Sequence, residues 1–284
     1  MPDSRIGREG HAARPRRTMT ISIGAIGAGR IAFITDQKAS LDNITIDHVM
    51  AKADFCSSPY WVAVWDGLPH IAHDVMIATR KRLADCSRPE DYTRARVTGA
   101  VAEAVRAERL QRAAIEVLGV YGLDMPTFLA TGSETFAEEH GRILERLESY
   151  DLGTSFLVCG FERASPVLAW VDPKGQIYDQ TRLGFWAIGN GFFAAQNTMS
   201  VLEHNSTKPL PDTVYAVCAA KFAAERCDGV GRWTTLGVID PVHGPCILTN
   251  DDADLVRVEW ERQARIPQSA ADVIRRSLPE KWRK

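Results

Sequence analysis

Apolar and polar positions divide the chain into strand-rich and helix-rich segments that follow one another in series. Alternating or continuous apolar runs predict strands over 20–26, 30–36, 42–47, 58–67, 153–162, 166–180, 183–191, 232–239 and 245–249. Helical periodicity predicts helices over 68–86, 89–119, 134–149, about 191–204 and 212–226, with a short strand near Phe128. Consecutive helices without intervening strands are typical of an α+β fold and not of alternating βαβ units.

Residues 1–19 differ from the rest of the chain. This segment is rich in Arg, Gly and Pro and lacks an apolar stretch like that of a secretory signal. We expect it to be a disordered arm, or to lie upstream of the true start of the protein. From Thr20 onward no repeat or low-complexity linker interrupts the pattern, which predicts a single domain over 20–284.

Composition and charge exclude two classes of partner. The chain has 284 residues, of which 45% are hydrophobic and 25% charged, and its formal net charge is −2, as expected of a soluble globular protein. Nucleic-acid binding would need a concentrated basic surface, which this balance does not provide. No run approaches the ~20 apolar residues of a membrane helix. We therefore expect neither nucleic acid nor membrane as a partner.

Cysteine and histidine spacing gives no sign of a metal site or a disulfide framework. The six cysteines have no C-x-x-C pairs, and His70 and His73 lack a third ligand at a suitable spacing. We expect mostly buried thiols in a reducing cytoplasm, no metal and no cofactor. Five tryptophans in strand-like runs are expected in the core: Trp61, Trp65, Trp170, Trp186 and Trp233.

The glycine-rich stretch "IGAIGAGRIA" has two interpretations. Gly27, Gly29 and Ala32 fit the G-x-G-x-x-A pattern that binds a dinucleotide. That site requires a helix directly after Gly29, but the following "FIT" prefers strand. We therefore favour a tight hairpin turn, in which glycine supplies a positive φ, and keep an NAD oxidoreductase as the weakest alternative.

Two segments resemble a proteasome β-type subunit of the N-terminal nucleophile (Ntn) hydrolase family, as found in bacteria. "TDQKAS" over 35–40 is similar to the family's "ADSRAT", and "GTSFLVCGFE…PVLAWVDPKGQIYDQ…FWAIGNG" is similar to "GTSLLVAGYD…PELYYVDPSGTY…AIGSGS". The resemblance implies a four-layer αββα sandwich with two antiparallel sheets between helix layers. It also implies a homo-oligomer, possibly a ring, that acts on a peptide or protein substrate.

The same resemblance implies three catalytic residues. The family uses an N-terminal Thr, an Asp sixteen positions later and a Lys thirty-two positions later, which correspond to Thr20, Asp36 and Lys52. A free α-amino group has a pKa of about 8 and can accept the threonine hydroxyl proton. Lys52 would favour the alkoxide-like state, and Asp36 would hold Lys52. Thr20 must then be the first residue, which translation from Met19 and removal of that methionine would achieve.

Supporting positions depart from the family pattern. Asp66 replaces the family's first turn glycine, although Gly67 follows, and a backbone amide at this turn would hold the oxyanion. Asn190 replaces a supporting serine, Asp228 corresponds to a later Asp after a one-residue shift, and a second serine is missing. The substrate pocket would draw on Ala39, Ser40, Met50 and Val64, and would prefer a hydrophobic residue before the scissile bond.

Two functions therefore lead. The first is a threonine-type protease or amidohydrolase that uses Thr20 on peptide or amide bonds. The alternative is a catalytically degenerate proteasome-like subunit with a structural or binding role, in which Asp36 and Lys52 form only a structural ion pair. Asp66, Asn190 and the missing serine favour the alternative.

Overall fold

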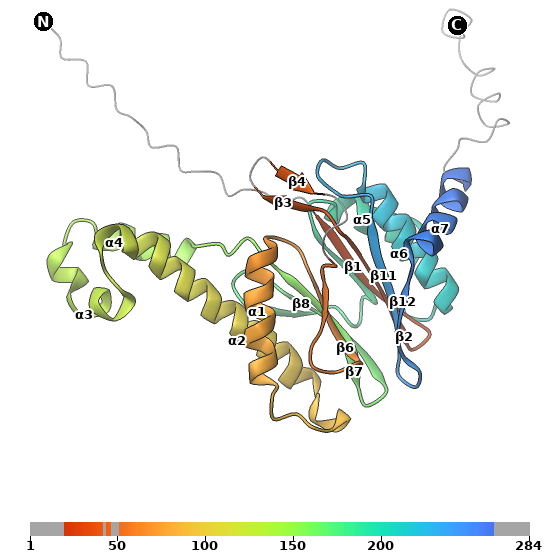
Figure 1. Cartoon of the computed structure of the whole chain (residues 1–284), viewed down its shortest axis with the longest axis horizontal. Helices are drawn as coiled ribbons and strands as arrows, with labels where there is room; N and C mark the ends of the chain where they lie inside the picture. The colour runs from red at the N-terminus through yellow and green to blue at the C-terminus, as the bar shows by residue number, and fades with distance from the viewer. Residues whose placement is uncertain (1–19, 42–43, 47–50, 264–284) are drawn as a thin grey trace, which may run out of the picture.

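Two antiparallel five-stranded sheets pack face to face, with helices on both outer faces (Figure 1). The structure is a computed structural model that describes residues 20–41, 44–46 and 51–263. It confirms the predicted α+β class and the two packed antiparallel sheets. The predictions for residues 1–19 and for Met50 lie outside the described residues.

The first sheet has the strand order β10-β1-β2-β11-β12. Its strands are β1 (Ile21–Gly27), β2 (Arg30–Asp36), β10 (Phe185–Gly189), β11 (Thr234–Asp240) and β12 (Gly244–Leu248). Gly27 pairs with Arg30 across a two-residue turn, in which Ala28 and Gly29 have φ of 46° and 76°. The predicted hairpin is confirmed. Because a strand and not a helix follows Gly29, the dinucleotide interpretation is wrong.

The second sheet has the order β5-β6-β7-β8-β9. Its strands are β5 (Ala53–Phe55), β6 (Trp61–Trp65), β7 (Phe156–Glu162), β8 (Ser165–Val171) and β9 (Ile177–Asp179). A separate small hairpin joins β3 (Ala39–Leu41) to β4 (Ile44–Ile46), in place of the single strand predicted over 42–47. Strand β5 is only three residues long and was missed by the sequence pattern.

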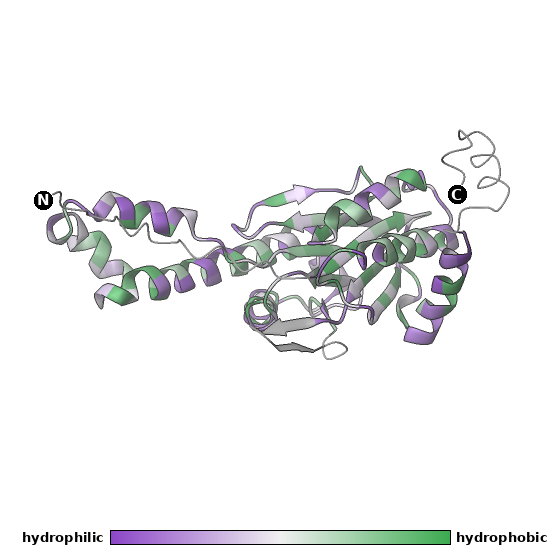
Figure 2. Ribbon diagram, turned by 90° about the horizontal axis from the view of Figure 1, so that it is seen from above, coloured by the Kyte–Doolittle hydropathy of each residue, from purple (hydrophilic) through white to green (hydrophobic). Residues whose placement is uncertain are grey.

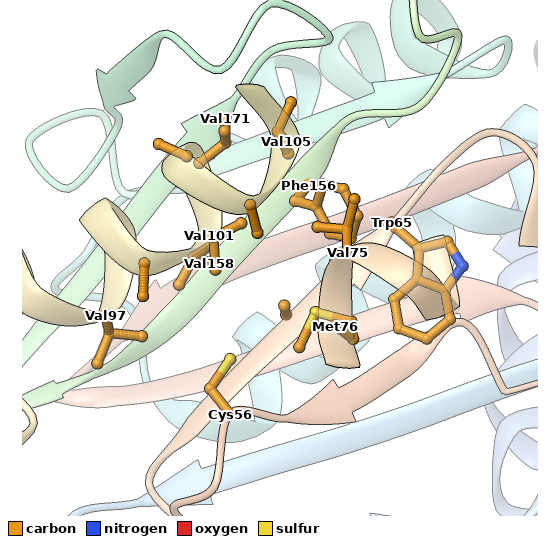
Figure 3. Packing of buried hydrophobic residues seen from close by; sticks show 14 of the residues in the cluster. Cys56, Trp65, Val75, Met76, Val97, Val101, Val105, Phe156, Val158 and Val171 are labelled. Carbon is orange, nitrogen blue, oxygen red and sulfur yellow. The ribbon is translucent and has the colours of Figure 1, made fainter. Parts of the chain in front are cut away.

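Apolar side chains from both layers of helices pack onto the sheets. Helices α1 (Pro69–Arg82) and α2 (Arg94–Ala113) cover the second sheet, and Figure 3 shows their valines and Met76 meeting Phe156 and Val158 of β7. Helices α5 (Phe192–Val201) and α6 (Leu210–Ala224) cover the first sheet, and α7 (Asn250–Gln263), which was not predicted, packs on α6 and β11. A third cluster fills the space between the sheets. The layer order is therefore helices, sheet, sheet, helices.

A helical arm projects from the sandwich beyond α2 (Figures 1 and 2). Helices α3 (Met125–Thr135) and α4 (His140–Ser149) pack there on residues 114–118, and the arm has its own core of Val117, Leu118, Phe128, Ile143 and Leu147. The strand expected near Phe128 is wrong, because Asp124 caps α3 by accepting the Thr127 N–H at 2.8 Å.

Within the described residues no single helix is long and apolar enough to cross a membrane, although the bent pair 94–121 and 125–135 passes the same test of length and composition when taken together.

Cysteines and tryptophans only partly follow expectation. Cys56, Cys86, Cys159 and Cys218 are buried, as predicted for most of the thiols. Trp61 and Trp65 are buried in the core, whereas Trp170 and Trp186 are half-buried and Trp233 is 43% exposed. The expectation of a core position is therefore wrong for Trp233.

Candidate active site

Thr20, Asp36 and Lys52 converge at the seam between the two sheets. Because β1 and β2 are antiparallel with Ser22 opposite Thr35, Thr20 just before β1 lies beside Asp36 at the end of β2. Lys52 directly precedes β5 of the other sheet, where its carbonyl accepts the Trp65 N–H at 3.2 Å. Three residues distant in sequence are therefore brought together by the pairing of strands.

The three side chains form one buried polar cluster, which we call the Thr20 centre. Thr20 Oγ1 donates to Asp36 Oδ1 and accepts a hydrogen bond from Lys52 Nζ. Lys52 Nζ also lies 2.8 Å from Asp36 Oδ1. The residues are 1%, 0% and 2% exposed, respectively. An ion pair this deeply buried is stable only when its polar atoms are satisfied, and here they bind one another.

Two backbone amides complete the surroundings of Asp36. The Ile21 N–H donates to Oδ1 at 3.2 Å, and the Gly231 N–H donates to Oδ2 at 3.0 Å. Asp36 therefore accepts from four donors, two from side chains and two from the backbone. Hydrogen bonds to both oxygens fix the orientation of the carboxyl group.

A second buried charge network holds the loop that carries Gly231. Lys221 Nζ is fully buried on α6 and donates to the Arg232 carbonyl at 2.5 Å and to Glu225. Arg257 binds Glu225 through two nitrogens at 2.6 and 2.8 Å. Burial lowers the pKa of Lys221, while Glu225 opposes that shift. The loop over 226–232 is thereby anchored beside Asp36.

Sequence reasoning missed these supporting residues. The one available signal was Lys221, a lysine within the apolar helical run "AVCAAKFAA", where a buried charge needs a partner. Gly231 carries no local signal, because its contact with Asp36 is made by its backbone amide.

The turn after β6 holds Asp66 and Gly67. The Asp66 N–H donates to the Ser155 carbonyl at 3.1 Å, and Asp66 Oδ1 accepts from the Ser155 N–H at 2.6 Å and from its hydroxyl at 2.9 Å. Burial raises the pKa of Asp66 to about 6, against the lowering effects of the Ser155 hydrogen bonds and the Lys52 charge. The amide of Asp66 is thus occupied.

Gly67 is the turn residue whose backbone amide is not occupied by a hydrogen bond to a described residue. Its N–H makes no hydrogen bond to any residue that the structure describes. Its φ is +93°, and a Cβ here would lie 2.4 Å from the Gly153 carbonyl oxygen and from Thr154 Oγ1. Glycine is therefore required at this position both by backbone conformation and by space. Of the two predicted turn residues, Gly67 is the one whose amide no described residue occupies, and Gly67 itself is buried.

Asp66, Asn190 and Asp228 line a cleft of about 620 Å³ beside the Thr20 centre. Asn190 and Asp228 are exposed at its wall. Gly189 also lines the cleft and touches Thr20 so closely that a Cβ would lie 2.3 Å from the Thr20 carbonyl oxygen. The structure therefore brings three further predicted site residues to one opening next to Thr20.

The predicted substrate pocket is less fully described. Val64 is completely buried in the cluster between the sheets and does not line this cleft. Ala39 and Ser40 pair through their backbones with Ile46 and Thr45 in the small β3–β4 hairpin, and Met50 lies outside the described residues. The specificity assigned to these residues stays a prediction.

The two histidines singled out as possible metal ligands lie on one helix. His70 and His73 are exposed on α1, and within the described ranges no group of three or more His, Cys, Asp or Glu residues is arranged to hold a metal ion. The chain matches no model of a known protein family and no curated protein sequence, so a function has to be inferred from this geometry.

Proposed function

We propose that the protein is a hydrolase of peptide or amide bonds in which Thr20 is the nucleophile, of the Ntn type found in proteasome β-type subunits. One observation carries the proposal: the Thr20 hydroxyl is hydrogen-bonded to both Lys52 and Asp36, and Gly189, which packs on the Thr20 carbonyl, lines a cleft. A threonine hydroxyl is a weak nucleophile until a base and a positive charge act on it. The arrangement supplies the charge within the protein and leaves the base to the α-amino group of Thr20.

The base requires a free amino terminus at Thr20. An amide nitrogen inside the chain is not basic, whereas a terminal amine has a pKa of about 8. We therefore propose that the active protein begins at Thr20, as it would after translation from Met19 and removal of that methionine.

The proposed reaction has two stages. The amine takes the hydroxyl proton, Oγ1 bonds to the substrate carbonyl carbon, and the carbonyl oxygen becomes an oxyanion that the Gly67 N–H would stabilise. The C–N bond then breaks, the leaving amine takes the proton back from the α-ammonium group, and an ester on Thr20 remains. A water molecule, deprotonated by the same amine, cleaves that ester and regenerates Thr20.

Lys52 and Asp36 have separate roles in this scheme. The ammonium group of Lys52 touches Oγ1 and lowers the energy of the developing alkoxide. Asp36 holds Lys52 at 2.8 Å and is itself fixed by the backbone amides of Ile21 and Gly231. Asp36 is thus a positioning residue for the lysine as well as an acceptor for the hydroxyl.

The test combines identification of the first residue of the purified protein with a measurement of its peptide cleavage. Amino-terminal sequencing of the purified protein should give Thr20 as the first residue, and that protein should cleave fluorogenic peptides. Thr20→Ala should reduce the cleavage rate by at least about 1,000-fold, whereas Thr131→Ala, an exposed threonine on the arm, should leave it unchanged. Cleavage that survives Thr20→Ala, or a protein whose active form retains residues 1–19, would refute the proposal.

A second candidate is a degenerate subunit with a structural or binding role. It is favoured by the occupied Asp66 amide and by the carboxylate of Asp66 near Lys52, where an oxyanion would meet negative charge. In that case Asp36 and Lys52 join the two sheets as a buried ion pair. A protein that begins at Thr20 but cleaves no peptide would support this candidate.

Assembly is a separate proposal that rests on the same resemblance. We propose that copies of the chain associate into a homo-oligomer, possibly a ring. Sedimentation velocity should show a species several times heavier than one chain of 31.4 kDa, and a monomer across the accessible concentration range would contradict this.

A further inference from the structure

Four aromatic rings form one wall of the cleft beside the Thr20 centre. Trp170 comes from β8, Trp186 from β10, and Phe192 and Phe193 from the first turn of α5. Neighbouring rings touch in sequence: Trp170 and Trp186 have centroids 5.9 Å apart, Trp186 and Phe192 5.4 Å, and Phe192 and Phe193 5.2 Å. We call this set the aromatic wall.

One ring of the aromatic wall is largely exposed, whereas the other three are half-buried. The side chain of Phe193 is 77% exposed, although a phenylalanine gains free energy by leaving water. The indole N–H of Trp170 is buried without a hydrogen-bond partner among the described residues. Large apolar groups that gather in a cleft with a few polar atoms are the usual composition of a ligand site.

The charges around the wall restrict the occupant. The polar side chains lining the cleft are those of Asp66, Ser155, Asn190, Cys227 and Asp228, and no Lys or Arg is among the described lining residues. An acidic group entering the cleft would meet two carboxyl groups and no Lys or Arg side chain among the described lining residues. A neutral aromatic group would instead meet ring faces and edges, which attract other rings.

The cleft is in direct contact with the nucleophile's backbone. Gly189 both lines the cleft and packs on the Thr20 carbonyl, and the Gly191 N–H, one residue before Phe192, lies 3.5 Å from the same oxygen. Strand β10 also pairs with β1 so that Gly189 is opposite Ile21. A group held on the aromatic wall would therefore belong to a substrate whose scissile bond lies at Thr20.

We infer that the aromatic wall is a specificity site that receives an aromatic side chain of a peptide substrate and rejects an acidic one. The inference rests on the proposed function for the location of the scissile bond. It differs from the pocket expected at Ala39, Ser40, Met50 and Val64, because it is built from β8, β10 and α5.

Binding to a protein that cannot cleave tests this inference. The probes are capped tripeptide amides, acetyl-Ala-X-Ala-amide with X as Phe, Ala or Glu, added to the Thr20→Ala protein. Quenching of tryptophan fluorescence and titration calorimetry report binding without hydrolysis. The Phe peptide should bind at least about tenfold more tightly than the Ala peptide, since one ring is removed from water, and the Glu peptide should bind most weakly.

Variants of exposed residues locate the site. Phe193→Ala, added to Thr20→Ala, should abolish most of the preference for Phe. Val201→Ala is the matched control, because Val201 is 80% exposed on the same helix and does not line the cleft. Asp228→Asn should strengthen binding of the Glu peptide severalfold and leave the Ala peptide unchanged.

Three outcomes would overturn the inference. The first is equal binding of the Phe and Ala peptides, and the second is a preference for Phe that survives both Phe193→Ala and Trp186→Ala. The third is a change of oligomeric state in Phe193→Ala with unchanged peptide binding, which would make the wall a contact between copies of the chain. Since these readouts need no cleavage, they are independent of whether Thr20 is the nucleophile.

Discussion

Two aspartates border the candidate site, and their surroundings are opposite. Asp36 lies in the Thr20 centre, completely buried, and accepts from four donors on both of its oxygens. Asp66 lies half-buried at the cleft, and its hydrogen bonds from Ser155 reach one oxygen only. Burial raises the pKa of Asp66 to about 6.

The difference shows that burial alone does not decide what a carboxyl group does. Asp36 accepts hydrogen bonds from Lys52 and from two backbone amides, so that removing it would take an acceptor away from each of these donors. Asp66 resists ionisation, and its charge at neutral pH is a cost to the folded protein. The Thr20 centre is therefore stabilised by its buried ion pair, whereas the negative charge of Asp66 destabilises the turn after β6.

The largest expected effect comes from removing the charge that organises the Thr20 centre. Asp36→Ala removes the carboxylate that accepts from the buried Lys52 ammonium and from two backbone amides, and should lower the free energy of unfolding by about 3–5 kcal/mol. Urea denaturation measures the change. Asp228→Ala is the control, since Asp228 is exposed and its loss should change stability by less than about 0.5 kcal/mol. A loss below 1 kcal/mol for Asp36→Ala would mean that the ion pair does not support the fold.

Gly189 packs on Thr20 and also lines the cleft that Asp66 borders. A side chain at Gly189 should therefore disturb the Thr20 centre. Gly189→Ala places a Cβ 2.3 Å from the Thr20 carbonyl oxygen, so Thr20 must move. Because a shift of about 1 Å in a reacting group can cost about 100-fold in rate, peptide hydrolysis should fall by roughly that factor.

Gly29→Ala is the matched control for this change. Gly29 also has a positive φ, of +76°, but a Cβ there meets nothing within 4 Å. Both variants carry the strain of a positive φ, and only Gly189→Ala crowds Thr20. Equal losses of hydrolysis in the two variants would show that strain, and not displacement of Thr20, is responsible.

The smallest expected effect is a gain in stability at Asp66, with a defined pH dependence. The pKa of Asp66 is about 6 in the folded protein and near 3.8 when unfolded. As pH rises from about 4 to 6, the unfolded chain releases this proton first, which destabilises the folded state. Asp66→Asn keeps the oxygen that accepts from Ser155 and removes the charge. It should raise the free energy of unfolding by about 1–3 kcal/mol at pH 8.

That gain should disappear below about pH 4, where Asp66 is protonated in both states. Urea unfolding at pH 4 and pH 8 checks the sign. Asp228→Asn, a change of the same chemistry at an exposed position of the same cleft, should show no comparable gain. If Asp66→Asn lowered the free energy of unfolding at pH 8, the charged carboxylate of Asp66 would have to stabilise the fold, contrary to this prediction.

Much of the fold follows from the sequence pattern. The strands at 20–26 and 30–36, the turn at Gly27 to Gly29, and the main helices are local features that periodicity and glycine report. The arm at Phe128 was misjudged because its helix is started by an Asp124 cap and not by apolar spacing. Short strands such as β5 depend on their neighbours in the sheet for stability, and so leave a weak local signal.

The candidate site was predictable to a different extent. The resemblance to the Ntn hydrolase family implied that Thr20, Asp36 and Lys52 act together, and the structure places their side chains in hydrogen-bond contact. The occupied amide of Asp66 could not be foreseen, because its partner Ser155 is eighty-nine positions away. The position of Trp170 and Trp186 in the cleft could not be foreseen either, because tryptophans in strands normally fill the core.

The central claim is that Thr20 Oγ1 forms a covalent ester with substrate, and one measurement addresses it most directly. A p-nitrophenyl ester of a capped peptide is mixed with the protein that begins at Thr20. The released p-nitrophenol is then followed and the acyl group is located by mass spectrometry. We expect a burst of one p-nitrophenol per chain and one acyl group, carried on Thr20 and absent from Thr20→Ala. A protein that begins at Thr20 yet shows no burst, or carries the acyl group on another residue, would contradict the account.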